Sequence, residues 1–378
     1  MTKSVLTILA AAALTASAQA AIFTQGNLVV VRATSTTSTL SSAAASTFLD
    51  EYTPAGTLVQ SIALPTSTSG ANRALSLRGN GDSEGALSRS ADGRYLVLTG
   101  YDAAPGTASV GTSASATINR VVGRVNVNGV ADTSTVFTNA FSGNAIRSAA
   151  TVDGSNYWVS GGTSGVQYIA HGATNGTQLS TTPTNNRFVS IYNSQLYVSS
   201  ASGSNIGVNT VGSGLPTSGT NSVSLLPGIS NTNGATSPYD YFFASPTTLY
   251  IADDSAGTLS ANAGIQRWTL TAGTWTRQAV LANTSIFAGG ALDGFRPRNL
   301  TGTTDALGNT ILYVTGSTAS GSALIALTDN GTSTGAFNTI ATSASGSIFR
   351  GVEFTPIPTP GALALLGLGG LVATRRRR

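Results

Sequence analysis

Cysteine is absent from this chain of 378 residues, so neither a disulfide framework nor a thiolate metal site can form. Histidine occurs once, at His171, which excludes any site that needs two histidines from one chain. Charged residues make up only 9% of the sequence, whereas hydrophobic residues make up 41%. Zinc fingers, histidine-rich metalloenzymes and cysteine-based redox enzymes are therefore excluded, and the apolar content is not that of a disordered chain.

What the sequence has instead is short runs of Val, Ile, Tyr and Leu, separated by Gly, Ser, Thr, Asn and Asp. No 3.6-residue periodicity is sustained between residues 21 and 356, so these runs predict strands and turns, in an all-β domain. A unit of strand, tight turn and second strand recurs along this region. The second strands of its clearest copies are residues 96–100, 157–161, 197–200, 250–253 and 313–316.

Further strands follow most of these hairpins, and units of four strands repeated at this spacing are typical of β-propeller blades. The first unit has only three strands, at residues 27–32, 47–53 and 57–63, and residues 347–354 form a single strand after the last unit. We therefore expect strand 347–354 to complete the first blade and close a ring of six blades. Seven blades is the alternative count. A β-sandwich rarely needs this many residues, and the repeat is too long for a β-helix rung.

The repeat also predicts where charged side chains meet, because the innermost strand of each propeller blade lines a central channel. Counting back from the second strand of each hairpin places charged residues at one level around this channel. The predicted ring consists of Arg147, Arg187, Asp240, Arg298 and Arg350, with Glu84 added from the second blade. Two interpretations stay open: a network of arginine–carboxylate pairs that ties blades together, and a site for an acidic ligand such as a uronic acid or a sulfated glycan.

The first twenty residues have the order of a secretory signal peptide. Lys3 supplies the positive charge, residues 5–16 are apolar, and Ala18 and Ala20 flank Gln19 in a small-x-small cleavage site. The apolar stretch is too short for a transmembrane helix. We expect signal peptidase to cleave after Ala20 and the chain to be exported.

Residues 357–378 form a different kind of signal. Pro358 and Pro360 precede an apolar stretch, residues 361–373, and the chain ends in four arginines, Arg375, Arg376, Arg377 and Arg378. This order resembles the PEP-CTERM sorting tail of exported bacterial proteins, although Thr359 stands where that family usually has Glu. The same type of tail has also been named after ice-binding proteins, a name that implies no ice-binding activity.

The resemblance implies processing by an exosortase-type protease at the cell envelope, cell surface or extracellular matrix. It also implies that the membrane is contacted only through the tail, before processing, with the arginines on the cytoplasmic side. The two signals account for the net charge of +4, since removing Lys3 and the four terminal arginines leaves 14 basic against 15 acidic residues. No basic surface is left to support binding of nucleic acid.

No catalytic constellation is recognisable in the domain between the two signals, residues 21–356. Gly331–Gly335 matches G-x-S-x-G, but no helix pattern or nearby histidine accompanies it. Carboxylates at Asp82, Glu84, Asp253 and Asp254 could ligate calcium, although capping of loops explains them as well. We predict no metal or cofactor and no enzyme activity, and interpret His171 as an exposed loop residue. The expected function is an exported structural or binding module, with binding of an acidic polysaccharide as the alternative and a polysaccharide hydrolase or lyase as a weaker one.

Processing at both ends is testable by intact-mass spectrometry of the protein recovered from its native envelope. The expected mass lacks residues 1–20 and the arginine-rich end, because both signals direct cleavage. A mass that includes Met1 to Ala20 would contradict export through the signal peptide. A mass that includes the four terminal arginines would contradict processing of the tail.

Overall fold

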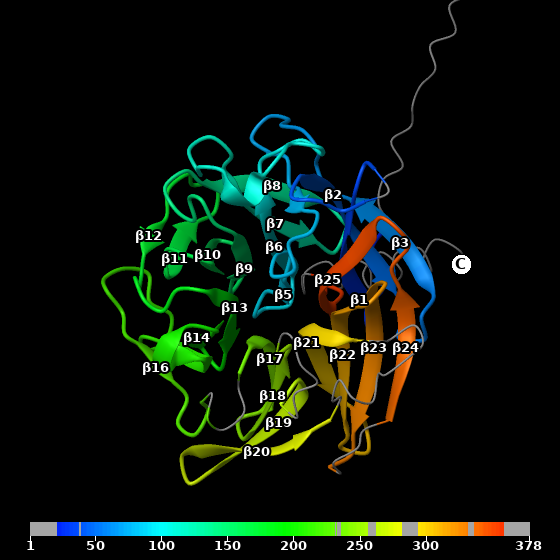
Figure 1. The fold of residues 1–378 in the computed structure, drawn as a ribbon, viewed down its shortest axis with the longest axis vertical. Helices are drawn as coiled ribbons and strands as arrows, with labels where there is room; N and C mark the ends of the chain where they lie inside the picture. Colours follow the sequence, from blue (N-terminus) through cyan, green and yellow to red (C-terminus); the bar gives the residue numbers. More distant parts are fainter. Residues whose placement is uncertain are drawn as a thin grey trace, which may run out of the picture.

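Six four-stranded antiparallel blades form a ring in the computed structural model (Figure 1), which describes residues 21–37, 39–230, 232, 236–255, 262–281, 294–331 and 336–358. The predicted all-β propeller is confirmed, with six blades rather than seven. The first blade contains β25 (Ser347–Phe354), β1 (Leu28–Thr34), β2 (Ala44–Tyr52) and β3 (Leu58–Ala63), with the short β4 (Leu77–Arg78) paired to β2. The second contains β5 (Leu87–Arg89), β6 (Tyr95–Tyr101), β7 (Arg120–Asn126) and β8 (Ala131–Phe137).

The other four blades follow in chain order around the ring. The third contains β9 (Ile146–Ala150), β10 (Asn156–Gly161), β11 (Val166–Ala170) and β12 (Thr177–Gln178). The fourth contains β13 (Asn186–Tyr192), β14 (Gln195–Ser200), β15 (Gly207–Val211) and β16 (Val223–Leu225). The fifth contains β17 (Pro238–Ser245), β18 (Thr248–Asp253), β19 (Gly264–Thr271) and β20 (Thr274–Val280). The sixth contains β21 (Arg296–Thr304), β22 (Thr310–Thr318), β23 (Gly321–Asp329) and β24 (Ala336–Thr342).

Most of the core lies between neighbouring blades, and β6 shows why its sequence is continuously apolar. Leu96 and Leu98 pack with residues of the first blade, whereas Val97, between them, packs with residues of the third blade. Successive side chains of a strand point to opposite faces, so a strand that is buried on both faces is apolar at successive positions instead of alternating. Each blade is thereby held by the blades on either side of it.

The ring is closed by β25, which lies beside β1 although more than three hundred residues separate them (Figure 1). The two strands pair in antiparallel register, with Leu28 opposite Phe354 and Thr34 opposite Ser347. The rings of Phe349 and Tyr52 meet edge to face at 6.2 Å. The expected closure by the last strand is confirmed, and it gives β1 a partner that it would otherwise lack.

Five of the six inner strands are interrupted by a β-bulge, at the same end of the channel. The residues left out of the regular pairing are Arg147 in β9, Arg187 and Phe188 in β13, Tyr239 and Asp240 in β17, Arg298 in β21, and Arg350 and Gly351 in β25. A bulge bends its strand and redirects a side chain. We call this end of the channel the arginine end.

The predicted signal peptide and all of the predicted sorting tail after Pro358 lie outside the described residues. The predicted processing residues Ala18, Ala20, Pro360 and Arg375 to Arg378 belong to these segments, and only Pro358 is described. The packed body continues past Pro356, because the backbone N–H of Ile357 donates a hydrogen bond of 2.9 Å to the carbonyl of Gly93. In the part of the chain that the structure describes, no helix reaches the length and apolarity needed to cross a membrane.

Removing the closing strand should destabilise the whole ring. A chain that ends at residue 346 loses the buried side chains of Phe349 and Val352 and exposes β1. We expect its Tm to fall by about 10 °C or more relative to a chain that ends at residue 358, with a broader transition. Calorimetry on the two chains measures this, and addition of a peptide of residues 347–358 should restore part of the loss. Equal melting of the two chains would contradict closure by β25.

Candidate functional site

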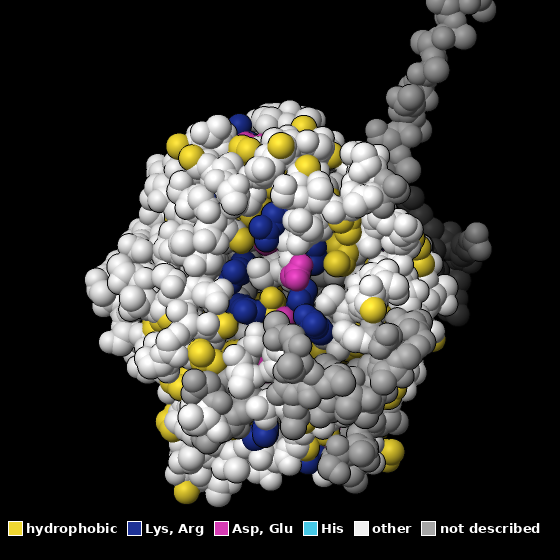
Figure 2. Space-filling view, in the orientation of Figure 1, with side chains coloured by type: hydrophobic (Ala, Val, Ile, Leu, Met, Phe, Trp, Pro, Cys, Tyr) yellow, Lys and Arg dark blue, Asp and Glu magenta, His cyan; other side chains and the backbone are white. Residues whose placement is uncertain are grey.

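Four arginines converge at the arginine end of the channel, from four different blades. Figure 2 shows basic side chains gathered around the middle of this face, with acidic side chains among them. Arg147 and Arg187 come from neighbouring inner strands, and the charge of Arg187 contributes to lowering the pKa of Arg147. The charge of Arg298 acts in the same way on the pKa of Arg350. We call Arg147, Arg187, Arg298 and Arg350 the arginine cluster.

Tyr239 of β17 lies between the two halves of the cluster. The guanidinium carbon of Arg187 is 3.8 Å from the centre of its ring, and that of Arg298 is 5.3 Å away. Both arginines therefore make cation–π contacts with one tyrosine. Arg187 has little else, because its Nε and Nη1 are buried without a hydrogen-bond partner among the described residues.

Arg147 and Arg350 are held mainly by backbone carbonyls. Arg147 Nη1 donates to Asn185 Oδ1 at 2.7 Å and to the carbonyl of Asn186 at 3.0 Å, and Arg350 Nη2 donates to the carbonyl of Gly79 at 3.0 Å. Burial lowers the pKa of each arginine to about 10, and the neighbouring arginine contributes to the shift. Both remain protonated at neutral pH, and the Nε of each is buried without a partner.

Arg298 is the member of the cluster that has carboxylate partners. Its Nη2 lies 3.1 Å from Asp82 Oδ2 and its Nε lies 3.2 Å from Asp254 Oδ2. Burial acts to lower the pKa of Arg298, but Tyr239, Asp82 and Asp254 outweigh it and raise the pKa. The Asp254 side chain is only 3% exposed, whereas that of Asp82 is 55% exposed and therefore accessible from the channel mouth.

Asp240 lies at the level of the arginines, as expected, but Tyr239, one residue earlier, makes the contacts with them. A second bulge in β17, between Phe243 and Ser245, adds one residue between the ring position and the hairpin turn. Counting back the same number of residues as in β13 therefore ends one residue too late. Asp240 lines the same small cavity as Arg187 and Tyr239, but its carboxylate accepts backbone hydrogen bonds from Tyr241 at 2.6 Å and Leu300 at 3.1 Å. Burial raises its pKa well above the ordinary value, and no arginine of the described chain pairs with it.

Glu84 lines this cavity too, but its ion pair is with Arg78, which is not a member of the cluster. Its Oε1 lies 3.1 Å from Arg78 Nε, and its Oε2 accepts a hydrogen bond from the backbone N–H of Arg78. Burial raises the pKa of Glu84, opposed by Arg78 and Arg350. Within the described ranges, three members of the cluster thus have no carboxylate within ion-pair distance: Arg147, Arg187 and Arg350.

The possible calcium ligands are occupied by protein partners. Asp82 and Asp254 pair with Arg298, and Asp253 accepts hydrogen bonds from the backbone of Thr236, Ser237 and Ser255. Across the described residues, no group of three His, Asp or Glu side chains is arranged to hold a metal ion. These carboxylates cap loops and neutralise an arginine.

The space between the arginines is small. Two cavities of about 10 Å³ lie at this level, one beside Arg187 and Tyr239 and the other beside Arg350, and Asp82 and Arg298 line both. Each has room for about one water molecule. A large ligand could not enter the channel here, but an acidic group of a larger molecule could reach the arginines from the mouth.

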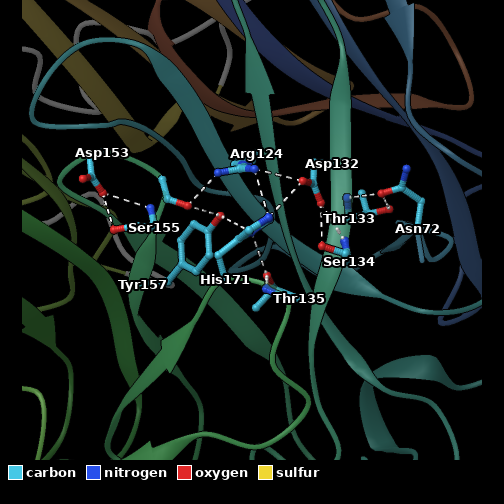
Figure 3. Close-up of polar contacts among 12 residues, drawn as sticks. Asn72, Arg124, Asp132, Thr133, Ser134, Thr135, Asp153, Ser155, Tyr157 and His171 are labelled. Atoms are coloured by element: carbon cyan, nitrogen blue, oxygen red, sulfur yellow. Dashed lines mark hydrogen bonds and ion pairs between the residues drawn. The ribbon is translucent and has the colours of Figure 1, made fainter.

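A separate polar cluster surrounds His171 between the second and third blades (Figure 3). Its Nε2 lies 2.9 Å from Arg124 Nη2 and 3.1 Å from Asp132 Oδ2, and its Nδ1 lies 3.2 Å from the hydroxyl of Tyr157. The interpretation of His171 as an exposed loop residue is therefore wrong. The residue follows β11 in a turn, but that turn lies against β7 and β8 of the preceding blade.

The ionisation of this cluster favours a neutral imidazole. Burial lowers the pKa of His171, as does Arg124, against the opposing effect of Asp132. Burial disfavours the charge of Asp132, but hydrogen bonds from Ser134 together with His171 and Arg124 hold its pKa below the ordinary value.

Comparison with known proteins gives similarity of fold only. No protein-family model matches the chain, and no curated protein matches it. A chain of a nidogen–laminin complex has 13% identity and a TM-score of 0.47, covering 87% of this chain and 98% of that one. A protein of unknown function from Bacteroides thetaiotaomicron has 11% identity and a TM-score of 0.44, covering 79% of this chain and 68% of that one. The WD40 repeats of RRP9 have 12% identity and a TM-score of 0.40, covering 82% and 80%.

Sequence reasoning missed the residues that contact the arginines from loops or from a bulge. Asp254 directly follows β18, and Asp82 lies in the loop before β5, so the repeat pattern of the strands does not assign either to the channel. Tyr239, which contacts two of the arginines, lies only one position before the residue that the sequence count selected, Asp240. The bulge that selects it has no distinct signal in the sequence.

Replacing His171 with Gln should make the stability less sensitive to acid. The pKa of His171 is lowered in the folded state, so the unfolded chain binds a proton more readily as the pH falls below about 6.5, and stability is lost in that range. We expect the Tm of the wild-type chain to fall about 1–2 °C further than that of His171→Gln between pH 7.5 and pH 5. Thermal melts at the two pH values test this, and parallel decreases would show that His171 does not resist protonation.

Proposed function

We propose that this chain is an exported, non-catalytic propeller that binds acidic groups at its arginine end. The observation that carries the proposal is Arg187, whose Nε and Nη1 are buried without hydrogen-bond partners beside Arg147. Unpaired guanidinium groups close together cost free energy through desolvation and repulsion. A carboxylate or sulfate at the mouth would relieve both, and bidentate pairing with arginine favours such groups over a simple point charge.

The size of the site suggests a polymeric ligand. Because the cavities between the arginines hold about one water each, only the acidic group would enter, and the rest of the molecule would stay outside. A chain of uronic acid or sulfated sugar residues has this form, since its acidic groups project from a neutral backbone. Asp82, exposed and paired with Arg298, is the carboxylate that such a group would displace.

The last described residues of the chain lie at the end of the propeller opposite the arginine end, and this supports an arginine end that faces away from the membrane. β25 runs from Arg350 at the arginine end to Glu353 near the opposite end, and residues 355–358 continue there toward Gly93. A sorting tail that follows Pro358 would hold the opposite end toward the membrane. The arginine end would then face away from it, toward extracellular polysaccharide.

Binding rather than catalysis fits the carboxylates of the arginine end. Asp82 and Asp254 pair with Arg298, and Glu84 pairs with Arg78, so each is committed to an arginine. A hydrolase of polysaccharides needs carboxyl groups positioned at the bond that is cleaved. Neither these residues nor His171, which lies between outer strands, provides that arrangement.

A purely structural network is the second candidate, and the contacts of Arg298 favour it. Arg298 from the sixth blade joins Asp82 from the loop before the second blade and Asp254 from the fifth. These pairs connect three blades across the axis without any ligand. The structural role and the binding role predict different behaviour of Arg187.

Arg187→Ala should weaken the binding of polygalacturonate or heparin by about 5- to 100-fold, the loss of one partly buried charge-assisted contact. Its Tm should stay within about 2 °C of the wild-type value, because the lost Nε and Nη1 have no hydrogen-bond partner among the described residues and the cation–π contact with Tyr239 is weak. Asp82→Asn should bind the same polymers more tightly. Affinities measured by biolayer interferometry at increasing salt should fall for all three chains.

Arg277→Ala is the matched control, since it removes an arginine from the outer strand β20 with the same change in net charge. It should leave the affinity unchanged. If no acidic polymer binds the wild-type chain and Arg187→Ala lowers the Tm by several degrees, the cluster is structural. Equal loss of binding in Arg277→Ala and Arg187→Ala would indicate attraction by net charge alone.

A further inference from the structure

A larger cavity lies at the opposite end of the channel, away from the arginine cluster. Its volume is about 180 Å³, and residues from all six inner strands line it. A cavity of about 150 Å³ in another protein holds one benzene molecule. This cavity therefore has room for one six-membered ring with small substituents.

One side of the cavity is aromatic. Phe188 and Tyr192 come from β13, and Phe242 and Phe243 come from β17, the inner strands of the neighbouring fourth and fifth blades. The rings of Tyr192 and Phe243 stack at 4.6 Å with an angle of 13° between their planes, and both side chains are half-buried. This side offers flat apolar surface to a ligand.

The other side is charged and polar. Arg89 of β5 and Glu353 of β25 belong to the second and first blades, which lie across the ring from the fifth and fourth (Figure 1). Thr301 of β21 lies beside Glu353 and donates a hydrogen bond of 2.8 Å to its Oε1. The ring geometry thus sets an aromatic wall opposite a polar wall.

Glu353 and Arg89 form hydrogen bonds within the protein through only some of their polar atoms. Glu353 Oε1 accepts from Thr301 and from the backbone N–H of Phe354, and its Oε2 has no hydrogen bond among the described residues. Arg89 is exposed and makes one hydrogen bond, of 3.4 Å, from Nη1 to the carbonyl of Thr355. An acceptor and several donors therefore remain available on the same wall.

The two charged groups of this wall have opposite signs, so a ligand with a single charge gains little net attraction. An anion would be attracted by Arg89 but repelled by Glu353, and a cation would meet the reverse. A neutral ring with hydroxyl groups can donate to the carboxylate and accept from the guanidinium, while its C–H face lies against the aromatic wall. A pyranose has this combination of an apolar face and a polar edge.

We propose that this cavity is a second binding site, which takes one uncharged pyranose residue. The aromatic wall of β13 and β17 stacks on the sugar ring, and Glu353 and Arg89 bind its hydroxyl groups. The site is separate from the arginine cluster, so it stands whether or not the cluster binds an acidic ligand.

Ligand-observed NMR titrations of the full chain test the proposal. The probes are the methyl pyranosides of glucose, galactose, mannose and xylose, with methyl glucuronide as the anionic and choline as the cationic comparison. At least one neutral glycoside should bind saturably, with Kd in the millimolar range or lower and at least tenfold tighter than either charged probe. Tyr192→Ala should raise that Kd at least tenfold and Glu353→Gln at least fivefold.

Two variants make the result specific. Tyr168→Ala removes a half-buried tyrosine of β11 in the third blade, whose ring packs against Trp158. It should leave the Kd of the sugar unchanged. Arg187→Ala should also leave it unchanged, which separates this site from the arginine cluster. The proposal is overturned if no neutral glycoside binds, if a charged probe binds most tightly in the Arg187→Ala chain, or if folded Tyr192→Ala and Glu353→Gln bind as the wild type does.

Discussion

Antiparallel pairing of β25 with β1 is the contact on which the arrangement of all six blades depends. Each blade buries its faces against two neighbours, so the first and sixth blades would each lack one neighbour in an open arc. β25 solves this by adding the last strand of the chain to the first sheet, where Phe349 and Val352 pack with Tyr313 of the sixth blade. Closure also creates the axis, because only a closed ring brings the inner strands of opposite blades face to face.

Closing the ring forces side chains of like charge together, and the structure compensates for this unevenly. Arg298 pairs with two carboxylates and contacts the ring of Tyr239. Arg187 contacts the face of the same ring, but its Nε and Nη1 have no hydrogen-bond partner among the described residues. Burial lowers the pKa of Arg147 and Arg350, yet guanidinium is too basic to lose its charge at neutral pH. The positive charge at this end is thus a permanent property of the fold, since ionisation cannot remove it.

The two ends of the channel differ because each inner strand changes character along its length. β25 carries Arg350 on the side of the arginine end and Glu353 three residues further on, and β13 carries Arg187 before Phe188 and Tyr192. At the bulge of β25, Gly351 lies so close to β5 that a Cβ would be 2.2 Å from the backbone nitrogen of Leu87. Residues of the same strands that follow the bulges line the larger cavity. One ring of strands therefore presents two surfaces of different chemistry.

The strands, their grouping into blades and the closing strand are predictable from the sequence, because the alternation of apolar runs and turns is local and strand 347–354 has no other partner. Seven blades stayed an alternative to six until the ring was seen. The repeat also predicts that Arg147, Arg187, Arg298 and Arg350 meet at one end of the channel, since it places them near equivalent positions. That Tyr239 rather than Asp240 contacts the arginines follows only from the folded ring, because one bulged residue in β17 shifts the count without a signal of its own. The same holds for the partners Asp82 and Asp254, for the packing of His171 against Arg124, and for the wall of Tyr192 opposite Glu353. These contacts join residues far apart in the chain, and their geometry exists only after the ring has closed.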